Sequence, residues 1–298
     1  DATVAQAQAD FIAHDPRVRL LMDNGGGSAG PGAMQPVWEI DLPSWPPPQG
    51  VATTFFLGAH GSLSSATAAS GTVAFYPNPA TRPRTDLPTS NSSGLSTSAW
   101  AAIPGYDWAP VTGPSGLGFI STPLHRDLVV AGFASLDLEL MSSASDTDLQ
   151  VTISEVRPDG KEMFVQSGDL RASLRALDDQ LSTATEPVPT YLPSEAALLP
   201  AGQFVEVRIP IFPFAYAFRA GSRIRITITA PGGDRPVWAF ATPATGGKVK
   251  DTIEIGGPSG SALVLDVLPG VTPPDPQPAC PSLRGEPCRK YVPAGNGG

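Results

Sequence analysis

The chain has 298 residues, including 31 Gly and 34 Pro, and only 16% of its residues are charged. This length is enough for a sizeable core in one or two domains, and the Gly and Pro content favours short strands joined by turns over a helical fold. The formal net charge of −9, without any basic run, argues against a nucleic acid or an anionic membrane as partner, and the apolar runs are too short to span a bilayer.

The first predicted element is a helix over residues 3–14. Its apolar side chains, Val4, Ala7, Phe11 and Ile12, recur at helical spacing. Asp15-Pro16 predicts the end of the helix, because the residue before a proline avoids the α region. Residues 18–22 are then expected to form a buried strand, and residues 24–35 a Gly-rich linker.

The stretch over residues 128–175 is the centre of the predicted fold. Apolar and polar residues alternate along 133–140 and again along 149–153, which indicates strands with one buried face. Residues 157–160 read Arg-Pro-Asp-Gly, a tight-turn sequence. Strand and turn at this spacing predict an antiparallel sandwich with one solvent-exposed face.

Further strands are expected at residues 199–209, at 214–228 around a turn at Gly221, and at 250–268. Arg223 and Arg225 share one face of their strand, and we interpret that face as solvated. The remaining residues, 269–298, show no strand pattern, which predicts an extended tail.

The two cysteines of the chain, Cys280 and Cys288, both lie in this tail. A small disulfide loop is one interpretation, and it predicts a protein that is secreted or resides in the periplasm or at the cell surface. Two free or metal-binding thiols are the alternative. No His or further Cys lies nearby in sequence to complete a zinc site.

Catalytic and metal-binding motifs are missing from the sequence. The three histidines, His14, His60 and His125, form no ligand cluster. Residues 26–30 fit the G-x-S-x-G pattern of a nucleophile elbow, but no helical repeat follows them. Asp146 and Asp148 are expected to cap a turn and not to bind calcium. We therefore predict no catalytic residue, no metal and no cofactor in this chain.

Several ordered motifs resemble one known family. The segments Asp146-Thr147-Asp148, 156–160 (VRPDG) and 168–175 (GDLRASLR) are followed and preceded, in the same order, by similar segments at 38–63, 118–124 and 214–228. Together they cover about residues 10 to 270. They resemble the C-terminal region of the X-prolyl dipeptidyl-peptidase and cocaine-esterase (CocE/NonD) serine hydrolase family.

The resemblance implies an all-β fold, a jelly-roll (galactose-binding-like) β-sandwich preceded by a short helix–strand remnant of an α/β-hydrolase domain. Residues 1–35 would be the remnant and linker, 36–268 the sandwich and 269–298 the tail. The catalytic Ser, Asp and His would lie upstream. The expected partner is an N-terminal α/β-hydrolase domain or chain, contacted through Phe11, Trp38 and Trp45, and the expected substrate is a peptide, ester or amide. Whether the protein forms a homo-oligomer stays open.

The long irregular loop over residues 78–111 carries three large aromatic residues, Trp100, Tyr106 and Trp108. The corresponding loop of the family packs toward the active site, so these rings are candidates for the substrate cleft. The alternative is that they pack onto their own sandwich. A free carbohydrate- or ligand-binding module is a second functional hypothesis, since this fold hosts both roles. A structural surface protein is a third.

Overall fold

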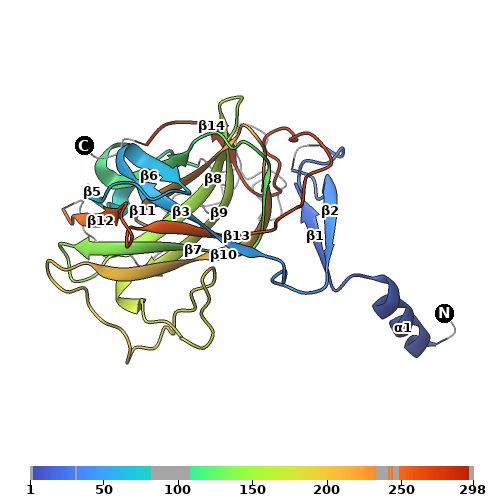
Figure 1. Ribbon diagram of the computed structural model, residues 1–298, viewed down its shortest axis with the longest axis horizontal. Coiled ribbons are helices and arrows are strands. Elements are labelled where there is room, and N and C mark those ends of the chain that lie inside the picture. The colour runs from blue at the N-terminus through green and yellow to red at the C-terminus, as the bar shows by residue number, and fades with distance from the viewer. Residues whose placement is uncertain are drawn as a thin grey trace.

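The computed structural model describes residues 3–30, 32–81, 108–232, 241, 243 and 248–294. Within these ranges it is an all-β sandwich with one α-helix at the N-terminus (Figure 1). In chain order the α-helix and strands are α1 (Val4–His14), β1 (Val18–Met22), β2 (Trp38–Leu42), β3 (Val51–Gly58), β4 (Ser62–Ser64), β5 (Gly71–Phe75), β6 (Gly116–Ser121), β7 (Leu128–Ser142), β8 (Asp148–Val156), β9 (Lys161–Arg171), β10 (Val205–Phe218), β11 (Arg223–Thr229), β12 (Asp251–Ile255), β13 (Ala262–Val267) and β14 (Cys288–Lys290). Short 3-10 turns cover Ala59–Gly61, Pro79–Thr81, Gly113–Ser115 and Ala172–Leu174.

The described strands form two sheets. β1 and β2 make a small antiparallel hairpin of their own, with Val18 opposite Leu42 and Met22 opposite Trp38. The other twelve strands pair in the order β14-β9-β8-β11-β6-β4-β3-β13-β7-β12-β5, and β10 pairs with β7. All pairs are antiparallel except β4 with β6. The predicted all-β class and N-terminal helix are confirmed.

The longest strands, β7 and β10, follow directly from the central stretch of the sequence. β7 places Leu136, Leu138 and Leu140 on the core side, as their period of two predicts. β10 pairs only with β7 among the described strands, and it contains Pro210 and Pro213, which a strand at the edge of a sheet tolerates. A register shift between Ile211 and Phe214 accommodates the second proline.

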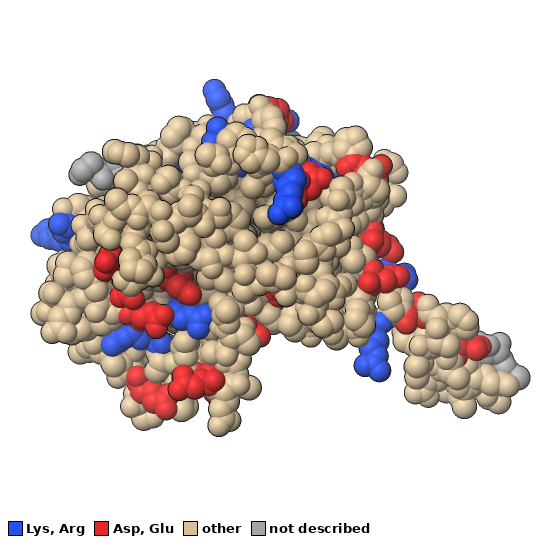
Figure 2. Space-filling view, in the orientation of Figure 1, with Lys and Arg blue, Asp and Glu red and all other residues tan. Residues whose placement is uncertain are grey.

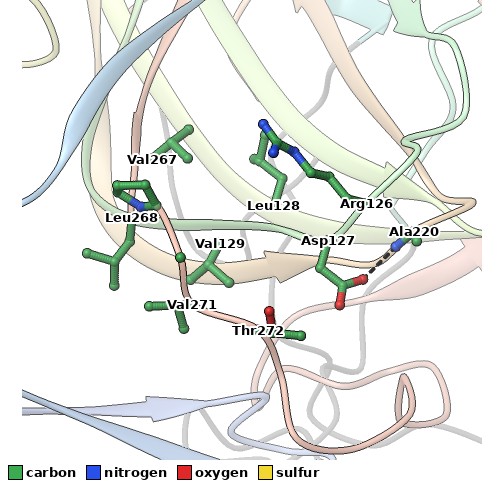
Figure 3. A pocket seen from close by; sticks show the side chains of 11 residues that line it. Arg126, Asp127, Leu128, Val129, Ala220, Val267, Leu268, Val271 and Thr272 are labelled. Atoms are coloured by element: carbon green, nitrogen blue, oxygen red, sulfur yellow. Dashed lines mark hydrogen bonds between the residues drawn. The ribbon is translucent and has the colours of Figure 1, made fainter.

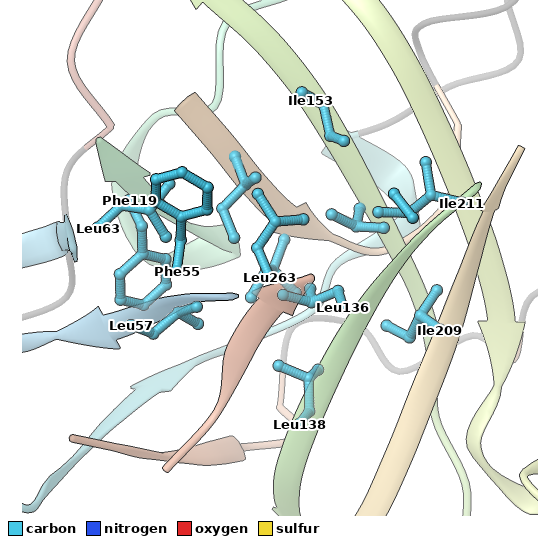
Figure 4. Close-up of a cluster of buried hydrophobic side chains, with 14 of the residues drawn as sticks. Phe55, Leu57, Leu63, Phe119, Leu136, Leu138, Ile153, Ile209, Ile211 and Leu263 are labelled. Atoms are coloured by element: carbon cyan, nitrogen blue, oxygen red, sulfur yellow. The ribbon is translucent and has the colours of Figure 1, made fainter. Parts of the chain in front are cut away.

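The core lies between the two layers of the sandwich (Figure 4). β7 and β10 contribute Leu136, Leu138, Ile209 and Ile211, and they meet side chains of the facing strands, such as Ile153 of β8 and Phe119 of β6. Burying each of these side chains contributes roughly 1.5 to 3 kcal/mol relative to leaving it in water. The apolar alternation seen in the sequence is therefore the main source of stability.

Three predictions about exposure are wrong. β8 was expected to have a solvent-exposed face, but all nine of its residues are buried, including Gln150 and Thr152, because this sheet is covered on its outer side as well. Arg225, predicted to be solvated, is also buried, and it pairs there with Glu162. β1 was expected to be buried, yet only Met22 is, since the hairpin has one face in solvent.

The C-terminal tail provides much of this cover. It follows the outer surface of the sandwich and adds β14 to the edge of β9, with Cys288 opposite Met163. The predicted bond between Cys280 and Cys288 is present, with an S–S distance of 1.97 Å. Among the described helices, none is long and apolar enough to cross a membrane.

Candidate functional site

The N-terminal helix α1 projects from the sandwich and is exposed along its whole length (Figure 1). Thr3 caps the helix by accepting a hydrogen bond from the Gln6 amide at 3.2 Å. On the apolar side, Phe11 is 65% and Ile12 70% exposed. A helix of 11 residues is marginal in water without tertiary packing. The apolar side of α1 therefore suits contact with another polypeptide segment.

The β1–β2 hairpin connects α1 to the sandwich. Its outer face carries charges: Arg19 Nε donates to Asp41 Oδ1 at 3.0 Å and lies 3.4 Å from Glu39 Oε2. Exposed pairs of this kind contribute at most about 1 kcal/mol. Figure 2 shows acidic and basic side chains gathered where the hairpin meets α1, whereas the visible side of the helix is almost free of Lys, Arg, Asp and Glu. The hairpin therefore presents a charged surface, whereas α1 presents a mostly uncharged one.

The inner face of the hairpin is fixed by a buried polar cluster. Trp38 Nε1 donates to Asp23 Oδ2 at 3.1 Å, and Arg219 Nη2 donates to the same oxygen at 2.6 Å. Burial raises the pKa of Asp23, and Arg219 and Trp38 oppose that shift. Since Arg219 directly follows β10, this ion pair ties the hairpin to the end of that strand. Removing either partner would leave a buried charge without its counter-ion.

Apolar contacts complete the junction between hairpin and sandwich. A second core cluster, separate from the main core, contains Met22, Val129, Ala131, Ala217 and Leu268. Trp38 and Trp45 pack against this cluster, and the Trp45 ring lies 6.5 Å from that of Phe133. Both tryptophans, predicted for a partner interface, are thus partly buried within the chain, whereas Phe11 is not.

A cavity of about 430 Å³ adjoins this junction (Figure 3). Val129, Leu268 and Val271 line it and also belong to the second cluster or pack against it. At its polar end Asp127 accepts a hydrogen bond from the Ala220 amide at 2.7 Å, and exposed Arg126 lies beside it. The cavity therefore has an apolar wall next to the charged Arg126 and Asp127, on the same side of the sandwich as the hairpin.

The Asp-Thr-Asp turn and the arginine of β9 form one unit. Arg171 bonds both carboxylate oxygens of Asp148, at 2.7 and 2.9 Å. Asp146 accepts from the Ser173 amide at 2.9 Å and from the Ser173 hydroxyl at 2.7 Å. Asp146 caps the turn as predicted, since it also accepts from the Thr147 amide at 3.0 Å, whereas Asp148 binds Arg171. Two motifs separated in the sequence therefore stabilise each other as structural elements.

Of the candidate cleft aromatics, only Trp108 lies within the described residues; Trp100 and Tyr106 lie outside them. Trp108 is 5% exposed. Its ring meets Phe164 edge-on at 5.4 Å, and the Arg289 guanidinium lies 3.5 Å from the ring centroid. Arg289 also donates to the Trp108 carbonyl at 2.6 Å. Trp108 thus packs onto its own sandwich, which was the alternative to a place in the cleft.

A family model matches residues 10–250 of the chain, and that family is described as the X-Pro dipeptidyl-peptidase C-terminal non-catalytic domain. The match spans most of the chain. The chain belongs to this family. The resemblance noted from the Asp-Thr-Asp and Gly-Asp-Leu-Arg motifs is thereby confirmed. In the structure these two motifs are joined, because Arg171 binds the carboxylate of Asp148.

The related proteins of known sequence are hydrolases by name. A protein of Mycobacterium bovis named "Putative serine esterase" is 32% identical over 114 residues, which are 38% of this chain and 18% of that protein. A Mycobacterium tuberculosis protein with the same description matches equally. This chain of the non-catalytic family therefore spans only a small part of these relatives.

Solved structures show the same fold at low sequence identity. An aminopeptidase from a marine sediment thaumarchaeon has a TM-score of 0.59 and 19% identity, covering 89% of this chain and 43% of that one. A CocE/NonD family hydrolase of Staphylococcus aureus has a TM-score of 0.55 and 19% identity, covering 77% and 39%. An α-amino acid ester hydrolase has a TM-score of 0.53 and 19% identity, also covering 77% and 39%.

The described part of this family member contains neither a metal cluster nor a nucleophile elbow. No set of three or more His, Cys, Asp or Glu residues there could hold a metal ion. The Gly-rich loop with Ser28 leads into β2 and not into a helix, so it lacks the strand–turn–helix geometry of a nucleophile elbow. The chain brings no recognisable catalytic constellation together in these residues.

Sequence reasoning missed two buried charged clusters. In one, Glu155 accepts from Tyr216 at 2.6 Å and from Arg157 at 3.0 Å, and burial together with Glu155 raises the pKa of Tyr216 well above its ordinary value. In the other, Glu162 binds both Arg225 and Arg289. Both clusters involve partners far apart in the sequence, so no local pattern could have indicated them.

A row of acidic side chains on the opposite layer was also missed. Glu139 of β7 lies directly opposite Glu206 of β10, and Glu254 of β12 is close enough to act on it. The pKa of Glu139 is raised first by burial and then by these two carboxylates. Like charges on adjacent strands destabilise a sheet, so this row reduces the stability of the fold.

Proposed function

We propose that this chain is the non-catalytic C-terminal part of a serine hydrolase of the X-Pro dipeptidyl-peptidase or carboxylesterase type. It would stabilise an N-terminal catalytic part and form one wall of its substrate cleft. The nucleophilic serine and its partners would then lie on that catalytic part, which is consistent with the lack of a catalytic constellation in the described residues.

The observation that carries this proposal is the family match over residues 10–250, which is to a domain described as non-catalytic. The chain also covers only 39–43% of the structures named as hydrolase or aminopeptidase. Those proteins have room for a further domain of comparable size. The names aminopeptidase and α-amino acid ester hydrolase among the similar structures support peptides and esters as the substrate class proposed here.

The proposed contact with the catalytic part is made by α1 and the exposed side of the hairpin. The exposed Phe11 and Ile12 supply an apolar surface without a partner among the described residues of this chain. Trp38 and Trp45 would act mainly by holding the hairpin to the sandwich, because their rings pack on the second cluster. Their partly exposed edges are available to the partner as well.

The cleft role is assigned to the segment that ends at Trp108. Trp100 and Tyr106 belong to that segment and are the proposed substrate contacts. Trp108, which follows them in the chain, is fixed to the sandwich by its packing on Phe164 and under Arg289, and a cleft wall requires rigid supporting residues. We also propose that the protein acts outside the cytosol, which the Cys280–Cys288 disulfide supports.

Native mass spectrometry combined with a fluorophosphonate probe tests this function. The native material should contain a segment that reacts with the probe, either on a second polypeptide or on a longer form of this one, and the label should lie outside residues 1–298. A purified chain that occurs alone, without any reactive serine partner, would overturn the proposal and favour the ligand-binding module.

A matched pair of variants tests the contact surface. Phe11→Ser should weaken association with the catalytic part by about tenfold or more, since burying a Phe contributes roughly 1.5 to 3 kcal/mol. Leu181→Ser is the control, because Leu181 is exposed to a similar extent (62%) in the connection between β9 and β10. Equal effects of the two substitutions would contradict the assignment of α1 to the interface.

A further inference from the structure

The C-terminal residues 277–294, which we call the strap, lie beyond the segment that the family model matches. In Figure 1 the strap, in red, passes from the hairpin across the end of the sandwich to β14. It contacts the hairpin at one end and the sheet at the other. Its sequence gave no strand signal, so its position is a product of tertiary contacts alone.

The first half of the strap touches the loop that follows β1. The Arg284 amide donates to the Asn24 carbonyl at 2.7 Å, and Gly25 forms an isolated β-bridge with Leu283. Gly25 has a φ of +139°, and a Cβ at this position would lie only 2.4 Å from the Arg284 nitrogen. The close approach of the two backbones therefore requires glycine.

Buried polar groups hold this half of the strap on the sandwich. Arg157 donates to the Pro278 carbonyl and to the Ser282 hydroxyl, both at 2.8 Å. Gln277 donates to both oxygens of Glu155 at 2.7 Å. Since Arg157 and Glu155 are buried, loss of the strap would remove hydrogen-bond partners from two charged groups in the interior.

The second half of the strap belongs to the sheet. Cys288 and Lys290 pair with β9, and Arg289 bonds Glu162 at 2.8 Å. The Cys280–Cys288 disulfide joins this half to the half that touches the hairpin. The disulfide thus links the part of the strap that contacts the hairpin loop to a strand that is held in the sheet. We call this link the fixed point of the hairpin.

The hairpin depends on this fixed point more than the sandwich does. Its own apolar contacts are the small second cluster around Met22 and Leu268, whereas the sandwich has the large main core. Elements with few buried contacts open first, at a lower free energy than the whole domain. Releasing the strap should therefore loosen the hairpin while the sandwich stays folded.

We propose that the strap is a disulfide-closed clamp that fixes the orientation of the N-terminal hairpin, and that reduction of Cys280–Cys288 releases it. Both cysteines are partly exposed, so a dithiol can reach the bridge. The dithiol passes two electrons to it, leaving two cysteine thiols and a disulfide on the reductant. The consequence for orienting the catalytic part rests on the proposed function; the clamp itself does not.

Hydrogen exchange measured by mass spectrometry on this chain tests the clamp. In Cys280→Ser/Cys288→Ser, and in the wild type with dithiothreitol, amides of residues 18–42 should exchange at least about tenfold faster, while those of β7 and β10 stay unchanged. Unchanged exchange in the hairpin, or an equal increase across β7 and β10, would overturn the proposal. The serine variant should show no response to dithiothreitol.

Gly25→Ala tests the same contact from the hairpin side with the disulfide intact, and it should raise exchange in residues 18–42 in the same way. Lys290→Ala is the control, because Lys290 is exposed on β14 away from the hairpin loop, and it should have no effect there. If Gly25→Ala leaves the exchange unchanged, the clamp is refuted. These measurements need no catalytic part, so they are independent of the test of the proposed function.

Discussion

Glu162 is the residue whose replacement should reveal the buried charge network most clearly. Its side chain is fully buried between Arg225 and Arg289 and accepts a hydrogen bond from Ser154 at 2.7 Å. Glu162→Gln keeps the shape but leaves two arginines near each other without their shared counter-ion. Breaking a buried ion pair in this way costs about 3 to 5 kcal/mol, so we expect the free energy of unfolding to fall by about 4 kcal/mol.

Arg225→Met should cost less, about 1.5 to 3 kcal/mol, because Glu162 keeps its bonds to Arg289 and Ser154. The decisive variant is Glu162→Gln/Arg225→Met, which removes the arginine that Glu162→Gln leaves unpaired. It should be more stable than Glu162→Gln alone, by roughly 1 to 3 kcal/mol, although it carries one more substitution.

Urea unfolding at pH 7, followed by far-UV circular dichroism, measures these differences, and the loss in Glu162→Gln corresponds to a drop of about 10 °C in Tm. Glu195→Gln, at an exposed position, serves as the control and should change stability by no more than about 0.5 kcal/mol. A double variant whose loss equals the sum of the two single losses would refute the idea that the three charges act as one network.

Three further predictions concern other parts of the fold. The pKa of Glu139 is raised in the folded state by burial and two neighbouring carboxylates, so its ionisation destabilises the fold as pH rises above the ordinary pKa of about 4.3. Glu139→Gln should therefore raise the free energy of unfolding by about 0.2 to 1 kcal/mol at pH 7. Urea titrations at pH 7 and pH 4 should show that this gain is lost near pH 4. Equal gains at both pH values would contradict this reading. Gly168→Ala should lower Tm, with a loss of about 1 to 3 kcal/mol, because its Cβ would lie 2.0 Å from the Pro210 carbonyl oxygen; an unchanged melting curve would show that the two strands separate easily. Phe11→Ser should leave the Tm of the chain within about 1 °C of the wild type, since the side chain is exposed, and a clear drop in differential scanning calorimetry would mean that α1 packs on its own domain.

Two aromatic residues show how far a local pattern can be taken as evidence of function. Phe11 was assigned to a partner surface from its position on a helical face, and the structure leaves it exposed as that assignment requires. Trp108 was considered for the cleft because it lies in an aromatic-rich loop, but Arg289, 181 residues further along the chain, covers its ring. Nothing in the neighbourhood of Trp108 in the sequence could reveal that contact.

The sequence by itself determined the class of fold and the family. Strand positions follow from a period of two, as in Leu136, Leu138 and Leu140, and turns from residues such as Gly160, whose φ of +78° suits glycine. These signals are local, because a strand alternates its side chains and a turn needs particular backbone angles wherever they occur. For the same reason the motifs around Asp148 and Arg171 could be recognised without coordinates.

Only the tertiary structure decided which polar faces are covered. Arg225 alternates with Ile224 and Ile226 as a solvated residue would, yet it is buried because the strap and Glu162, 63 residues away, lie over it. A pattern of period two distinguishes the two faces of a strand but does not say what each face meets. Coverage depends on contacts between distant segments, here fixed by the strap and its disulfide, and such contacts exist only in the folded chain.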